Sequence, residues 1–169
     1  MSKEFEKKLF DETEAFFTSR GTDVFYDEIE GKNVLVMEYS DDDSPVPADC
    51  TVSVIELDEG CTAVNIMFTL FPGSAAGASD DIETLLPLLN KYLTIGSFGF
   101  IKETGYLYFS CSFIVDENEE IINTMKLFLS TWEAAFDTSR EGLEILLPVI
   151  NGDVPAGSLT EDEATIIQF

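Results

Sequence analysis

The stretch LLPLLNKYLTIGSFGFIKETGYLYFSCSFIV, residues 85–115 of the 169-residue chain, decides the fold class. It begins as the end of a leucine-rich helix, leaves that helix at Asn90 and continues as two aromatic strands that turn at Thr104-Gly105. In the second strand, apolar residues occupy every second position from Leu107 to Val115, which is typical of a strand with one buried face. A helix followed directly by a hairpin predicts an α+β fold.

Hydrophobic periodicity and turn residues extend this pattern to the rest of the chain. The predicted ranges are, in chain order, a helix at 3–19, strands at 24–29, 34–39, 51–57 and 62–70, a helix at 80–93, strands at 98–102 and 106–115, and a helix from 121 to 150. We expect the last helix to break near 138–142 and to resume through 143–150. The sequence therefore predicts an α+β fold with one antiparallel sheet of about five to six strands, flanked by three main helices.

Two features mark the predicted middle helix. Asp80 is followed three residues later by Glu83, which resembles a capping box with Asp in the place of Ser or Thr. Pro87 lies inside the same helix. Because proline has no backbone N–H to donate, we expect the helix to kink or restart there.

The chain is predicted to form a single domain at residues 1–152, because a chain of this length can bury a core without disulfides or metals. Residues 153–169 are predicted to be an acidic C-terminal tail that is partly ordered, with Ile166–Phe169 as a candidate last strand. The segments 83–90 and 144–151 are identical at five of eight positions. Their flanking elements do not repeat, so coincidence or shared helix-end chemistry explains the similarity of the two segments better than a duplication.

The formal net charge of −24 excludes two classes of partner. Nucleic acids and anionic membranes are bound through Lys and Arg, and this chain has only nine of these residues against 33 acidic ones. The same charge favours basic partner segments. The start of the chain lacks the apolar region of a signal peptide, and the apolar runs are too short to cross a bilayer. We therefore expect a cytoplasmic protein, with Cys50, Cys61 and Cys111 as buried free thiols.

The sequence offers no recognisable catalytic or cofactor site. It has no histidine, which excludes every mechanism that needs an imidazole, and it has no CxxC pair and no phosphate-binding loop. We therefore predict no cofactor and no metal site. The acidic runs 41–43 and 116–120 contain oxygen ligands without the spacing of an EF-hand, so we interpret them as a solvated loop and a helix start.

A contact surface for another protein is the remaining candidate. Tyr106 and Tyr108 lie on the more polar face of their predicted strand, and Met67 takes the same kind of position in its own strand. Aromatic residues and Met are enriched at protein interfaces. We add Phe98 and Phe100 of the preceding strand, so the aromatic hairpin and Met67 are the predicted partner-binding residues.

The run LLPLLNKYLTIGSFGF, with Leu-Leu-Asn at its helix end followed by Gly96-Ser97-Phe98, resembles the YbjN family of small bacterial proteins. The hairpin at Gly105 and the later Leu147-Pro148 extend the resemblance, whereas Pro87 departs from the family pattern. The resemblance implies a fold like that of the type III secretion chaperones. It also implies a homodimer with a protein-binding or regulatory role, of the kind described as sensory transduction regulation.

The function that these observations predict is non-enzymatic. We expect a cytoplasmic, dimeric, chaperone-like or regulatory module that binds a basic or amphipathic segment of a partner protein. An acidic immunity or antitoxin-like protein that masks a basic partner is the alternative within the same class. A metal-dependent hydrolase that uses clustered carboxylates is the less favoured alternative from another class.

Overall fold

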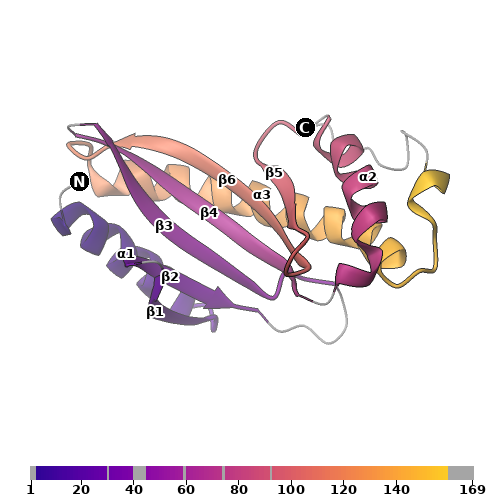
Figure 1. Cartoon of the computed structure of the whole chain (residues 1–169). Helices are drawn as coiled ribbons and strands as arrows, with labels where there is room; N and C mark the ends of the chain where they lie inside the picture. Colours follow the sequence, from indigo (N-terminus) through magenta and orange to yellow (C-terminus); the bar gives the residue numbers. More distant parts are fainter. Residues whose placement is uncertain are drawn as a thin grey trace.

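One antiparallel sheet organises the whole chain. The computed structural model describes residues 3–29, 31–39, 45–58, 60–73, 75–91 and 93–159. The strands are β1 (Asp23–Ile29), β2 (Lys32–Glu38), β3 (Asp49–Asp58), β4 (Cys61–Pro72), β5 (Ser97–Ile101) and β6 (Tyr106–Asp116), in the spatial order β1-β2-β3-β4-β6-β5. The helices are α1 (Lys3–Thr18), α2 (Ser79–Asn90) and α3 (Ile121–Ile150), with short 3₁₀ turns η1 (Ala75–Ala78) and η2 (Ala156–Ser158). The predicted α+β fold with six strands and three helices is confirmed (Figure 1).

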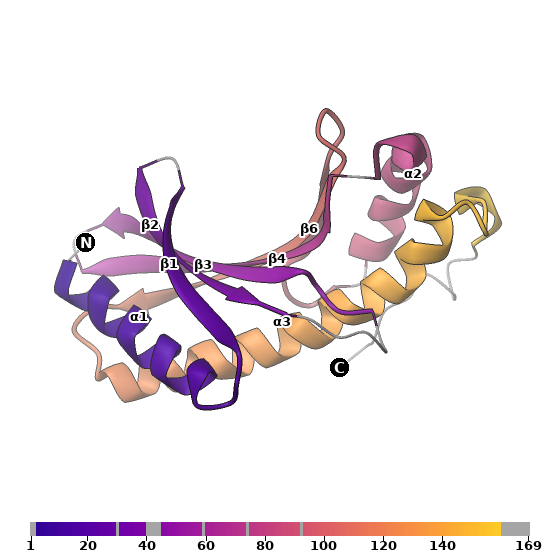
Figure 2. The same ribbon diagram turned by 90° about the horizontal axis from the view of Figure 1, so that it is seen from below.

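The helices are distributed unevenly around the sheet. Figure 2 shows α1 and α3 side by side against one face, while the opposite face carries no helix. The third helix, α2, packs against β5 and α3 at the far end of the sheet. The sheet therefore has one covered face, which forms the core, and one open face.

The hydrophobic core lies between the covered face and the two long helices. Strand alternation directs Val64, Ile66 and Phe68 of β4 to this face, and all three are completely buried. The register places Phe109 of β6 directly opposite Phe68. The alternation read from the sequence at 62–70 and 107–115 is thus the pattern of the core itself.

Trp132 packs between α1, α3 and the sheet. Its ring lies 4.7 Å from Phe17 of α1, 6.3 Å from Phe68 of β4 and 5.2 Å from Phe136 of its own helix, measured between ring centroids. Tyr39, at the end of β2, completes the group with a centroid distance of 5.5 Å to Phe136. Aromatic pairs at these separations add to the stabilisation from area burial alone.

Helix α3 is continuous, so the predicted break at 138–142 is wrong. Thr138, Ser139 and Gly142 are all buried, and they form the part of the helix that lies against its neighbours. The hydroxyl of Thr138 donates to the Ala134 carbonyl at 2.8 Å, and that of Ser139 donates to the Phe136 carbonyl at 2.8 Å. Small side chains with satisfied hydroxyl groups let α3 pack closely against its neighbours. Local helix propensity contains no information about this packing.

Gly142 of α3 packs closely against Phe98 of β5. A Cβ atom at this position would lie 2.1 Å from the end of the Phe98 ring. Phe98 is itself 3% exposed and packs edge-on against Phe109 at 4.9 Å, so its ring has little room to move. This contact fixes the C-terminal half of α3 on β5.

We expect Gly142→Ala to lower the free energy of unfolding. Overpacking costs about 1–3 kcal/mol, which exceeds the roughly 1 kcal/mol that alanine adds as a better helix former. Urea unfolding followed by circular dichroism measures the change. Gly157→Ala is the matched control, because nothing lies within 4 Å of its added Cβ. Stability of Gly142→Ala equal to or above the wild type would contradict the contact, and Phe98→Leu in the same chain should restore part of the loss.

The start of α2 differs from the prediction. Residue Ala78 precedes the helix and provides no side-chain cap, so the capping box at Asp80 and Glu83 is wrong. Both carboxylates instead bind Lys102, whose Nζ lies 2.8 Å from Asp80 and 3.0 Å from Glu83. The helix continues through Pro87, where a kink or restart was expected, and ends at Asn90 rather than at residue 93.

The free edge of β5 is protected by Asn90. Its side-chain amide donates to the Phe98 carbonyl at 2.9 Å and accepts from the Phe98 backbone N–H at 2.8 Å. The side chain thereby takes the place of a neighbouring strand at this position. Asn90, which the sequence predicts as the end of a helix, therefore also satisfies the backbone groups of Phe98 at the edge of the sheet.

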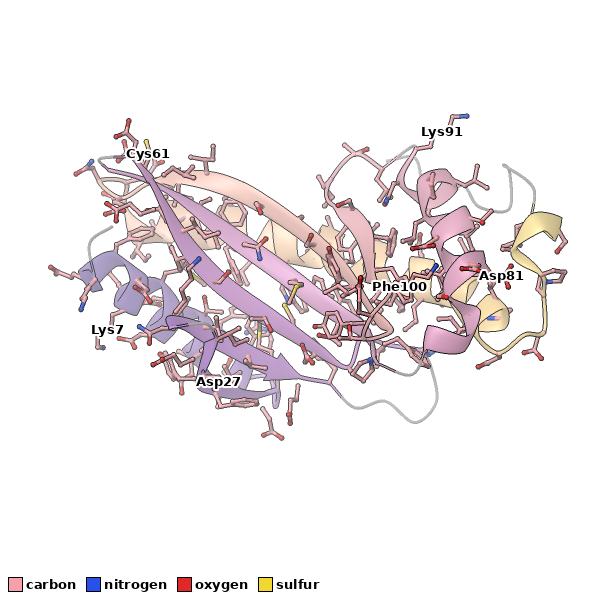
Figure 3. All side chains as sticks on the ribbon, in the orientation of Figure 1. Lys7, Asp27, Cys61, Asp81, Lys91 and Phe100 are labelled. Carbon is pink, nitrogen blue, oxygen red and sulfur yellow. The ribbon has the colours of Figure 1, made fainter. Side chains whose placement is uncertain are left out.

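The cysteines are all free, but only two are buried. Cys50 and Cys111 lie in the core, whereas Cys61 is exposed at the tip of the β3–β4 hairpin (Figure 3). The prediction of a buried thiol is thus wrong for Cys61, because it is the first residue after the turn. Burial raises the pKa of the Cys111 thiol to about 11 and raises that of Cys50 well above its usual value, so both are held as thiols.

The end of the described chain packs on the domain. Ala156 of η2 is buried, and η2 contacts α2. Part of the predicted tail is therefore ordered, and the candidate strand at Ile166–Phe169 lies outside the described residues. Within the part of the chain that the structure describes, no helix is both long and apolar enough to cross a membrane.

Candidate functional site on the open face of the sheet

The face of the sheet that α1 and α3 leave uncovered is the candidate site. Figure 2 shows it as a concave surface, with the β1–β2 hairpin rising at one side and the β5–β6 hairpin at the other. We call this surface the open face. By strand register it includes Phe25, Ser53, Ile55, Ala63, Asn65, Met67, Tyr106, Tyr108, Ser110, Ser112 and Ile114, together with the buried side chains of Val34, Val36 and Thr51 near β2.

The centre of the open face is polar without being charged. None of its residues at positions 51–55, 63–67 and 110–114 is ionisable. Asn65 and Ser112 stand opposite each other on β4 and β6, and the serine hydroxyl donates to the asparagine oxygen at 2.9 Å. In a chain with 33 acidic residues, this central area is a neutral region.

An apolar row crosses the open face near the β3–β4 turn. Ile55, Ala63 and Ile114 lie directly opposite one another on β3, β4 and β6. Ile55 is 42% exposed and Ile114 is 64% exposed. Phe25 of β1, 41% exposed, adds a further apolar side chain on the same face. The row offers apolar area to a second molecule.

Two tyrosines occupy the opposite end of the open face. The rings of Tyr106 and Tyr108 lie 6.0 Å apart, measured between centroids. A Cβ atom on Gly99 would lie 2.3 Å from the Tyr108 ring, so the glycine of β5 makes room for this ring beside the backbone. Both side chains remain half-buried, which leaves part of each ring accessible.

A hydrogen-bonded chain anchors these tyrosines to the neighbouring strands. The Thr69 hydroxyl donates to Asp49 at 2.7 Å and lies 2.6 Å from the Tyr106 hydroxyl. Because the single Thr69 proton points to Asp49, Tyr106 is the donor to Thr69. Thr69 is only 2% exposed, so its hydroxyl is not presented as a nucleophile. The chain joins β3, β4 and β6 and positions the tyrosine.

Burial raises the pKa of the Asp49 carboxyl above its usual value. The hydrogen bond from Thr69 acts in the opposite direction, and the nearby Glu38 carboxylate, directly opposite on β2, adds to the rise. A carboxyl with a raised pKa in the folded state disfavours folding once it is ionised. The stabilising contribution of the protonated carboxyl is therefore fully present at a pH below its pKa in the unfolded chain. It is lost as the pH rises through its pKa in the folded protein.

We expect Asp49→Asn to stabilise the protein at about pH 8, since asparagine removes the half-buried charge and keeps an oxygen acceptor for Thr69. The difference in free energy of unfolding between variant and wild type should shrink as the pH falls toward about 4. Urea titrations across this range measure it. A gain that does not depend on pH would contradict the assignment to the Asp49 carboxylate.

The predicted partner-binding residues divide between the two faces. Met67, Tyr106 and Tyr108 lie on the open face, as their alternation indicated. Phe98 and Phe100 lie on the covered side, since their pairing partners in β6 are the completely buried Phe109 and Leu107. Phe98 is a core residue, so its prediction as a contact residue is corrected, and Phe100 is half-buried against the core.

Sequence reasoning also missed three residues of the open face. Phe25, Ile55 and Ile114 occur in strands with several apolar residues, so each was read as part of an ordinary apolar pattern. Their places in the strand alternation, which put them out of phase with the core residues, are the signal that could have identified them.

The acidic run at 116–120 does not form a metal site within the described part of the chain. Among the described residues, no group of three or more Cys, Asp or Glu side chains could hold a metal ion. Asp116 accepts hydrogen bonds at 2.8 Å from both the backbone and the side chain of Asn118, which lowers the pKa of its carboxyl. The run at 41–43 lies outside the described residues.

No protein-family model matches this chain, and no curated protein matches it either. The resemblance to the YbjN family therefore stays a prediction from the sequence, and the candidate site is argued from its own geometry.

Proposed function

We propose that this protein is a non-enzymatic, cytoplasmic binding module that holds a segment of a partner protein on the open face. The observation that carries the proposal is the neutral, partly apolar centre of that face in a chain of net charge −24. The homodimer implied by the YbjN resemblance forms part of the same proposal.

The composition of the open face supports binding to protein. Antiparallel sheets often leave one face to water, and their strands then alternate polar residues on that face with core residues on the other. Here the outward positions of the central strands hold hydroxyl, amide, Met and Ile side chains. Depletion of charge together with Tyr and Met is the composition of the central area of protein interfaces.

The surroundings of the open face indicate what kind of segment would bind. Acidic residues stand at the strand ends on the same face, among them Asp27 of β1, Glu38 of β2 and Asp116 of β6. A segment with an uncharged middle and basic ends matches this distribution. The concave shape would bring both parts into contact at once (Figure 2).

Placing a photo-crosslinking phenylalanine analogue at Ile114 tests the proposed surface. In cells that naturally contain the protein, irradiation should join it to one discrete partner, whereas the same analogue at Leu127 of α3 should not. Leu127 is 43% exposed and lies on α3, which covers the other face, so it is a matched control. Identical products from both positions, or none from either, would contradict binding on the open face.

Replacing Ile114 by Asp should abolish recovery of that same partner with tagged protein, while Leu127→Asp should leave recovery unchanged. Because Ile114 is 64% exposed, the substitution should alter the melting temperature little. Thermal melting of both variants provides the check on folding.

The homodimer is tested by the mass in solution. Light scattering on the purified chain should give about twice the 18.7 kDa of one copy. A mass of one copy at all concentrations used would remove the dimer from the proposal without affecting the crosslinking result.

A further inference from the structure

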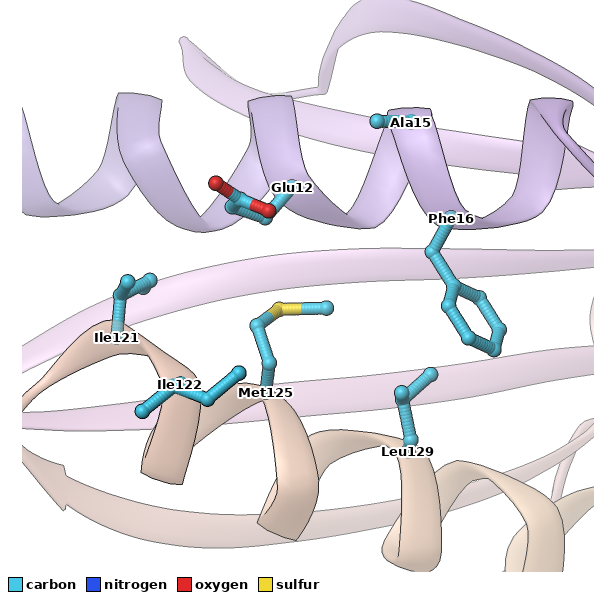
Figure 4. A pocket seen from close by; sticks show the side chains of 7 residues that line it. All are labelled: Glu12, Ala15, Phe16, Ile121, Ile122, Met125 and Leu129. Atoms are coloured by element: carbon cyan, nitrogen blue, oxygen red, sulfur yellow. The ribbon is translucent and has the colours of Figure 1, made fainter.

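Helices α1 and α3 leave an apolar groove between them on the side away from the sheet. Figure 4 shows Phe16 of α1 and Met125 and Leu129 of α3 pointing into the space between the helices. Glu12, Ala15, Ile121 and Ile122 also line the groove. The groove has a volume of about 430 Å³. Ile122 is 55% exposed, which is unusual for so large an apolar side chain beside other apolar groups.

The groove continues in both directions along the helix pair. Toward the N-terminal ends of the helices, Ile121 lines the groove and also a hollow whose charged lining is three glutamates and one lysine, Glu4, Lys8, Glu117 and Glu119. Toward the other end, Phe16 and Leu129 line the groove and also a hollow that reaches Trp132 and Glu133. The three adjoining hollows lie along α1, whose 16 residues span about 24 Å.

The floor and the margins of this groove differ in chemistry. The floor is apolar, and the margin carries acidic residues that include Glu12 and Glu133. Within the described ranges neither of these two carboxylates forms an ion pair. Arg20 lines the same hollow as Glu133, where its guanidinium group lies 3.5 Å above the Phe16 ring and donates to the Phe16 carbonyl at 3.1 Å. Within the described residues it forms no ion pair with either carboxylate.

We propose that the α1–α3 groove binds an amphipathic helix of a partner protein, with the apolar stripe of that helix in the groove and Lys or Arg along its sides. A groove between two helices accepts a third helix by the same ridge and groove packing that joins any helix pair. The apolar floor selects the stripe, and the unpaired margin carboxylates select the basic flanks.

Charge disfavours the other occupants. In a two-fold dimer formed through this groove, the acidic margin of one copy would face the same margin of the other. The chain beyond the described residues, at 160–169, contains Glu161, Asp162 and Glu163 and meets the same repulsion. The proposal is independent of the open face, because the groove lies on the opposite side of the sheet (Figure 2).

A synthetic helix of Leu and Lys is the probe. It has about 18 residues, with Leu at helical spacing on one stripe and Lys elsewhere, so that it spans the groove. Trp132, the single tryptophan of the chain, lines one end of the groove and reports binding through its fluorescence. The Leu–Lys peptide should bind saturably, and a peptide of the same pattern with Glu in place of Lys should not.

Two matched pairs of variants locate the site. Ile122→Asp should weaken binding by about tenfold or more, whereas Leu127→Asp, at an exposed apolar residue of the same helix outside the groove, should change it less than about twofold. Glu133→Lys should weaken binding more than Glu144→Lys, although both make the same change in net charge.

Each result decides for or against the groove. Equal effects within the Ile122 and Leu127 pair would show that the peptide does not bind in the groove, and equal losses within the Glu133 and Glu144 pair would show that it responds to net charge alone. Either result would overturn the proposal, as would absence of saturable binding. Ile114→Asp on the open face should leave peptide binding unchanged, so a failure here is distinguishable from a failure of the proposed function. If Ile122→Asp melts below the wild type, Ile122→Lys replaces it, and the same loss of peptide binding is expected.

Discussion

The close contact of α3 with the sheet is the constraint on which the rest of the structure depends. Helix α3 has 30 residues and can approach β5 only if its contact side is small at that point. Gly142 provides that space beneath Phe98. Since α3 then covers the core on one side of the sheet, α1 can pack beside it, and the aromatic group around Trp132 closes the layer between them.

The uneven distribution of helices has two consequences for function. The sheet keeps a concave face that no helix covers, and the two helices keep a groove on their own outer side. Both surfaces contain exposed apolar residues with acidic residues nearby, Ile114 on the first and Ile122 on the second. Grouped exposed apolar side chains are typical of interaction surfaces, so these are the two places for which we propose binding to another protein.

Much of the fold was predictable because the relevant information is local. Alternation at 62–70 and 107–115 identifies strands, and the apolar stripe at 3–19 identifies a helix, since each pattern repeats with the period of its own element. The errors occurred where a residue acts through a distant contact. Asp80 and Glu83 have the spacing of a cap and instead bind Lys102, and the small residues at 138–142 resemble a break and instead form a packing surface.

The sequence by itself determined the order of elements, the α+β class, the absence of histidine and the acidic charge, because these depend on residue types and on short periods. Only the tertiary structure decided which face each residue of the aromatic hairpin occupies. Phe98 and Tyr108 belong to adjacent strands, and pairing Phe98 with Phe109 places the first in the core and leaves the second on the open face. The strand register places Phe98 and Tyr108 on opposite faces. Contacts across the sheet and with α3 set this register, and a local sequence pattern does not contain those contacts.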